Sequence, residues 1–145
     1  MTPDLHAAPE PTRLAALAFR FKALCFQARR GVQNVLGRLP RHQPGNLFAH
    51  APSRGEWRAD LWRDANSPRE RRLQLGKVQN LRLAAHAFDG LEIPAGEIWS
   101  FWRQLGRTTA ARGFAEGREL REGCLIPTIG GGLCQISNAL FDVAL

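Results

Sequence analysis

The 145-residue chain has no tyrosine and three cysteines, Cys25, Cys124 and Cys134. No Cys-x-x-Cys pair is present, so the ligand spacing of a zinc site is missing, and the odd number of thiols argues against a disulfide framework. A bridge between Cys124 and Cys134 stays open at this point. The lack of tyrosine and of an RNP-like strand argues against nucleic-acid binding. We therefore expect free thiols, no metal site, no cofactor and no nucleic-acid partner.

Long hydrophobic runs are missing as well. Basic residues interrupt residues 13–39 before any apolar run reaches the length of a signal sequence or a membrane span. Residues 1–72 carry the whole net charge of +7, and residues 73–145 are neutral. A basic front half suits an anionic membrane surface or an acidic partner. The expected location is the cytoplasm, and association with a membrane surface is the alternative.

The front half is expected to be mainly helical. Residues 1–12 carry three prolines and predict a disordered lead-in. Residues 13–39 place apolar side chains three and four apart, which predicts one apolar helix face. Packing of that face against the fold is the default, and contact with an anionic membrane surface is the alternative. An extended connector follows over residues 40–55, and Trp57 and Trp62 predict a helical turn.

A second helix has a clear start and end in the sequence. Ser67 offers a capping hydroxyl, Pro68 takes the first helical position and Glu70 the third. Asp89 and Gly90 predict its end. Its expected buried stripe consists of Val78, Leu81, Ala84, Ala85 and Phe88.

The pattern changes after residue 90. Short strands are predicted at residues 91–93 and 98–102, and residues 125–126 are apolar until Pro127 stops the run. Helical spacing returns after the segment Gly-Gly-Gly-Leu-Cys-Gln and continues to the last residue. These patterns predict an α+β fold: amphipathic helices, then short antiparallel strands, then a helix that starts at the glycine-rich segment.

This segment is the expected functional centre. A run of three glycines costs backbone entropy, so it is tolerated where the chain needs positive φ or close approach. Cys134 then falls near a helix start, where free N–H groups and the helix dipole favour a thiolate. The same N–H groups and the Gln135 amide could hold an oxyanion, and Ser137 and Asn138 could orient a partner or cap the helix. The pattern is typical of a cysteine nucleophile.

A second interpretation stays open. The glycines could form only a tight turn, with Cys134 as a small buried hydrophobe. A thiol nucleophile also needs a histidine within reach, and all four histidines precede residue 87 without an assignable base among them.

Residues 77–145 resemble the VanW family, named after an accessory protein of vancomycin-resistance clusters. The matching stretches are residues 77–85, 93–102, 105–108, 113–118 and 130–138. The resemblance implies a link to glycopeptide resistance and to the cell wall or its precursors. Family members usually continue past the Cys-Gln motif into a histidine-containing segment. We therefore expect three regions: a lead-in over 1–12, a basic helical region over 13–76, and a VanW-like domain over 77–145 that is incomplete at its C-terminus.

Two hypotheses of function follow from the resemblance and the residues. The first is a cysteine-dependent amidase or acyl-transferase, with Cys134 and Gln135 as catalytic residues and a base outside this chain. The second is a non-catalytic module that binds a peptidoglycan-related peptide, a glycan or a protein partner. The residues expected to contact the ligand are Gly130, Gly131, Gly132, Ser137, Asn138, Trp99 and Trp102.

Overall fold

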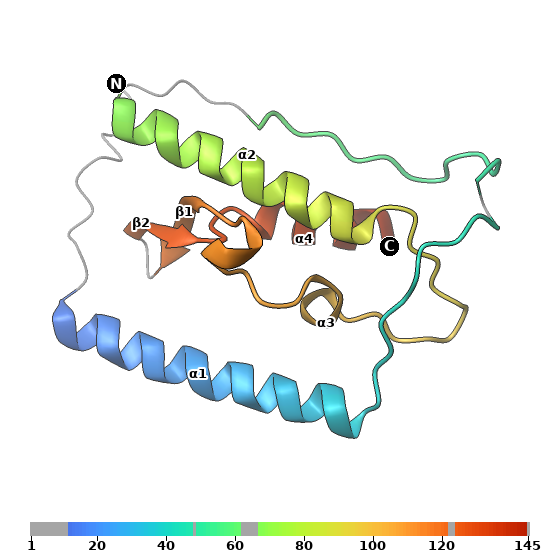
Figure 1. Ribbon diagram of the computed structural model, residues 1–145, viewed down its shortest axis with the longest axis horizontal. Helices are drawn as coiled ribbons and strands as arrows, with labels where there is room; N and C mark the ends of the chain where they lie inside the picture. The colour runs from blue at the N-terminus through green and yellow to red at the C-terminus, as the bar shows by residue number, and fades with distance from the viewer. Residues whose placement is uncertain (1–11, 48, 62–66, 122–123, 145) are drawn as a thin grey trace.

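The computed structural model describes residues 12–47, 49–61, 67–121 and 124–144. The fold is α+β, as the sequence predicts, and combines helices with a two-stranded antiparallel sheet. In Figure 1 the strands lie between the long helices α1 (Arg13–Leu36) and α2 (Pro68–Phe88). The disordered segment predicted for residues 1–12 falls almost wholly outside the described residues.

Helix α2 begins where local chemistry predicts. The Ser67 hydroxyl accepts a hydrogen bond from the Glu70 backbone N–H at 3.1 Å, which satisfies one of the free donors of the first turn. The helix ends at Phe88, before Asp89 and Gly90. Of the predicted stripe, Leu81 and Ala84 are buried, whereas Ala85 is exposed.

The sheet is a hairpin of β1 (Glu116–Arg121) and β2 (Cys124–Ile129), with Glu116 opposite Ile129 and Arg121 opposite Cys124. Pro127 lies inside β2 rather than ending it, which corrects the sequence expectation. Each strand of a two-stranded sheet has one side without a ladder partner, so a residue that lacks an N–H is tolerated there. The strand continues directly into the glycine-rich segment and α4 (Cys134–Ala144).

The core lies where α2, the short helix α3 (Phe101–Leu105) and the start of α4 meet. Its buried members are Ala84, Leu105, Phe114 and Leu133. Phe114 follows a single turn of 3-10 helix, η2 (Ala110–Arg112), which brings the chain back to α2 before β1 begins. This small core anchors the first residues of α4, because Leu133 precedes Cys134 directly.

Two predicted strands are wrong. Residues 91–93 form only an isolated bridge, Leu91 with Pro44, and residues 98–102 contribute the start of α3 instead of a strand. The aromatic run packs as a cluster, with Phe88 5.3 Å from Trp99 and 5.0 Å from Phe101 between ring centroids. A short apolar run does not distinguish a strand from a helix. Here the packing of the aromatic side chains against the end of α2 accompanies a helical start at Phe101.

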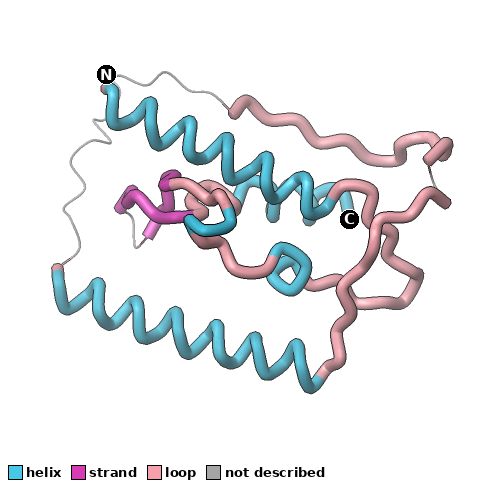
Figure 2. Tube along the Cα trace, viewed as in Figure 1, coloured by secondary structure: helices cyan, strands magenta, loops and turns pink. Residues whose placement is uncertain are grey.

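The connector between α1 and α2 is extended, as Figure 2 shows in pink. Residues 56–61 form no helical turn, so the turn predicted around Trp57 is wrong for the described part, and Trp62 lies outside it. Besides the bridge between Pro44 and Leu91, the Gln104 side chain holds the connector. Its Oε1 accepts from the His42 N–H and its Nε2 donates to the His42 carbonyl, both at 3.1 Å.

Helix α1 is where the default expectation fails. The apolar face predicted from residues 13–39 points to solvent, and Phe21 is 71% exposed. Contact with the hairpin uses the other side, where the Arg121 guanidinium lies 4.0 Å from the Phe19 ring centroid. Within the described ranges, no helix is long and apolar enough to cross a membrane.

Candidate functional site

The glycine turn, residues 130–133, connects β2 to α4 and has a backbone that requires glycine. Gly130 has φ of 80° and Gly132 has φ of 93°, a region that side chains with a Cβ rarely adopt. Gly131 is buried with its backbone directly against that of Gly117 in β1, and a methyl group on either residue would collide with the other's backbone. The glycine run predicts that another backbone approaches closely, and the structure shows this approach between Gly131 and Gly117 of β1.

One side chain locks this turn in place. Asn80 of α2 is fully buried, and its Nδ2 donates to the carbonyls of Ala115 and Gly131, both at 2.9 Å. Its Oδ1 accepts from the Ala115 N–H at 2.8 Å. A single amide thus ties α2 to the approach of β1 and to the glycine turn. Because buried polar groups need partners, this network specifies one arrangement of the three segments.

A glycine one helical turn before Asn80 makes the network possible. Gly76 is buried, and a Cβ there would collide with the carbonyl of Glu116. Sequence reasoning did not single out Gly76 or Asn80 as functional. The signal was available: both residues have low helix propensity yet lie four apart inside a strongly helical pattern, in line with Ala84.

Cys134 is the first residue of α4 and is exposed. The interpretation of Cys134 as a buried hydrophobe is therefore wrong. The first turn of α4 is tight: the Gln135 N–H donates to Gly132 and the Ser137 N–H donates to Leu133, at 3.2 and 3.1 Å. The positive end of the helix dipole lies at this turn and stabilises negative charge nearby.

The other predicted site residues surround Cys134 on the same turn. Gln135 is half-buried, whereas Ser137 and Asn138 are exposed. Cys134 Sγ has no hydrogen-bond partner among the residues that the structure describes. The arrangement offers an accessible thiol on a rigid support, with polar side chains beside it.

No histidine is placed as a base for this thiol in the described part of the chain. His42 is buried in the connector, where its Nδ1 lies 3.6 Å from Glu97. His50 lies in the exposed connector, and His86 is exposed near the end of α2. The described residues also contain no group of three His, Cys, Asp or Glu side chains that could hold a metal ion.

The two tryptophans predicted to contact ligand behave differently. Trp99 is half-buried in the aromatic cluster with Phe88 and Phe101, so it serves packing. Trp102 stacks edge-on against Phe101 with 5.1 Å between ring centroids and is 53% exposed. Of these two tryptophans, only Trp102 therefore presents substantial aromatic surface to a ligand.

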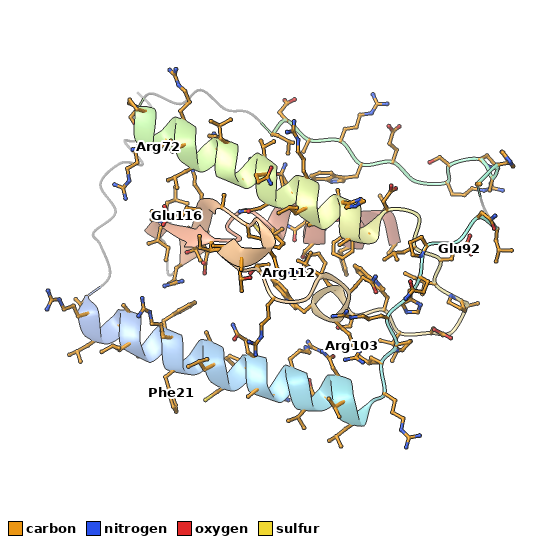
Figure 3. All side chains as sticks on the ribbon, viewed as in Figure 1. Phe21, Arg72, Glu92, Arg103, Arg112 and Glu116 are labelled. Carbon is orange, nitrogen blue, oxygen red and sulfur yellow. The ribbon has the colours of Figure 1, made fainter. Side chains whose placement is uncertain are left out.

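A groove that sequence reasoning missed lies beside α2. Its volume is about 1150 Å³, and α2, Glu116 and Pro127 line it. Three arginines along α2 border it, Arg69, Arg72 and Arg82, and Figure 3 labels Arg72 and Glu116 near its hairpin end. Arginines at these positions look like ordinary surface residues in sequence, because only the packing of α2 on the hairpin creates the groove.

Comparisons with known proteins place this site within a family. Residues 76–145 match the family model described as VanW like protein, and this range includes Asn80, the glycine turn and Cys134. The chain is 43% identical over 72 residues to the Vancomycin B-type resistance protein VanW of Enterococcus faecalis, covering 50% of this chain and 26% of that protein. It is 33% identical over 66 residues to the uncharacterized protein YoaR of Bacillus subtilis, covering 46% of this chain and 22% of that protein. The chain thus spans about a quarter of the length of these relatives. No solved structure matches it.

Proposed function

Because residues 76–145 make this chain a member of the VanW family, we propose that it contributes to glycopeptide resistance by acting on a peptidoglycan-related peptide through Cys134. The observation that carries the proposal is the placement of the thiol. Cys134 is exposed as the first residue of α4, directly after the glycine turn, whose Gly131 carbonyl accepts a hydrogen bond from Asn80. A catalytic nucleophile needs this combination of access and fixed position.

The chemistry is acyl transfer. The Cys134 sulfur attacks the carbonyl carbon of a peptide amide, a C–S bond forms, and the C–N bond breaks as the amine leaves with the thiol proton. Water or a second amine then attacks the thioester and regenerates the thiol. The start of α4 faces the oxygen on which negative charge develops, so the helix dipole and the Gln135 amide stabilise it.

This reaction also requires a base. No described histidine is bonded to the thiol, and His6 lies outside the described residues. The proposal therefore takes its base from outside the described part of the chain. For that reason the first test concerns thiol reactivity rather than turnover.

Cys25 supplies the matched control, because it is also exposed but lies in the middle of α1. Under iodoacetamide at neutral pH, followed by peptide mass spectrometry, we expect Cys134 to be alkylated at least about ten-fold faster than Cys25. Equal rates would contradict an activated nucleophile. In a host whose glycopeptide resistance depends on the protein, Cys134→Ala abolishes resistance and Cys25→Ala preserves it.

A binding module is the second candidate, and the arginine-bordered groove favours it. Guanidinium groups bind carboxylates with good geometry, and peptides carry a terminal carboxylate. If binding is the function, Cys134→Ala keeps resistance, whereas Arg72→Ala loses it. Arg71→Ala is the control, since Arg71 is an exposed neighbour on α2 that does not line the groove. Loss of resistance with Cys134→Ala alone points back to the enzyme.

A further inference from the structure

The outward side of α1 is a continuous apolar stripe. At about 100° per residue, its side chains span about 120° of the helix circumference with no charged residue between them. All of them are exposed, and Figure 3 shows Phe21 pointing away from the rest of the molecule. The members of the stripe are Leu14, Leu17, Ala18, Phe21, Leu24, Cys25, Ala28, Val32, Val35 and Leu36.

Within the described residues nothing covers this stripe, because α1 already uses its opposite side. Ala16, Phe19 and Ala23 are half-buried and Asn34 is buried, and all four lie across the helix from the stripe. Turning the helix to bury the stripe would expose these residues and break the contact between Phe19 and Arg121. Single exposed apolar residues are ordinary, but a continuous patch of ten neighbouring apolar side chains marks an interaction surface.

The charge around the stripe identifies what it contacts. Residues 12–55 contain eight Lys and Arg and no Asp or Glu. On α1, Arg13 and Arg20 border one edge of the stripe, and Lys22 and Arg29 border the other. Long basic side chains at such edges reach from an apolar surface to anionic groups beside it.

We infer that α1 lies flat on an anionic lipid bilayer, with the stripe inserted at the boundary of headgroups and acyl chains and the basic residues on lipid phosphates. The helix is about 36 Å long at 1.5 Å per residue, so the whole stripe contacts the surface at once. This inference is independent of the proposed function, which rests on residues 76–145.

A second copy of the chain fits the stripe less well than lipid does. Two α1 helices packed stripe to stripe would bring their basic edges together, and α1 carries no acidic residue to compensate that repulsion. An anionic surface turns the same charges into attraction, worth about 1 kcal/mol for each basic residue near the surface.

The test is flotation of the 145-residue chain with vesicles of phosphatidylcholine alone or mixed three to one with phosphatidylglycerol. We expect binding to the anionic vesicles that weakens as salt is raised. Phe21→Ser removes an aromatic ring from the stripe and should weaken this binding about ten-fold. Phe26→Ser is the control, because Phe26 is 56% exposed on the same helix but lies outside the stripe, and it should change binding less than about two-fold.

The charge is tested separately with Lys22→Gln and Arg29→Gln together, which should weaken binding to anionic vesicles and flatten its salt dependence. Far-UV circular dichroism verifies that each variant folds. Failure of the unchanged chain to bind anionic vesicles, or equal loss with Phe21→Ser and Phe26→Ser, overturns the inference. A concentration-dependent dimer that Phe21→Ser abolishes, without vesicle binding, also overturns it and assigns the stripe to a second copy.

Discussion

Replacing Asn80 with alanine tests whether one buried amide holds the glycine turn. The side chain is fully buried and makes hydrogen bonds of 2.8 to 2.9 Å to three backbone groups. After the change, the Ala115 carbonyl keeps the Gly130 N–H as a donor at 3.0 Å. The Ala115 N–H and the Gly131 carbonyl lose the partner that Asn80 provides.

The expected cost follows from those two groups. A buried donor or acceptor left without a partner costs about 1 to 3 kcal/mol. Asn80→Ala should therefore lower the free energy of unfolding by about 2 to 6 kcal/mol, a large part of the stability of a domain of this size. Gln79→Ala is the matched control, since Gln79 is an exposed amide on the neighbouring position of α2, and it should change stability by less than about 0.5 kcal/mol.

Urea unfolding followed by circular dichroism and tryptophan fluorescence measures both variants. The transition midpoint should fall for Asn80→Ala with little change in slope. A loss of less than about 1 kcal/mol at an unchanged slope would refute the reasoning, because the turn would then hold without the amide.

Two further predictions concern α1 and α2. Gly76→Ala should destabilise the chain by more than about 2 kcal/mol, because the new methyl group meets a backbone carbonyl of β1. Gly31→Ala in α1 places its methyl group in open space and should stabilise the chain by about 0.5 to 1 kcal/mol. Changes of the same sign for both variants in urea unfolding would contradict this account. Ser67→Ala removes the cap of α2 and should cost about 1 kcal/mol in the same assay, while Ser67→Asn, which restores a capping acceptor, should leave stability nearly unchanged.

Local chemistry was enough to predict the three longest helices, α1, α2 and α4, but not the short helix α3. Ser67, Pro68 and Glu70 determine the start of α2, because a capping hydroxyl, a proline without an N–H and an acidic first turn all suit the same helix end. Apolar spacing alone located α1 and α4. These signals depend on residues within one or two turns of each other, so no tertiary contact was needed to interpret them.

The candidate site was predicted in part. The sequence predicted the glycine turn and the position of Cys134 at a helix start. Glycine was informative because positive φ and close approach of another backbone leave few alternatives to it. The strand expected at residues 98–102 was wrong, because an aromatic run can pack in either conformation. The arginine-bordered groove was missed, because its two walls lie far apart in the chain.

The sequence by itself determined the three long helices α1, α2 and α4, the positions where the backbone must be glycine, and the cysteine that begins α4. Tertiary structure decided what those features face. The apolar pattern of α1 defines a stripe but not its direction, which depends on Phe19 and Asn34 taking the inward side. The glycine turn is placed by Asn80, fifty-one residues before Gly131, through a contact that no local pattern encodes. Periodicity is a property of neighbouring residues, whereas burial and direction depend on the whole fold.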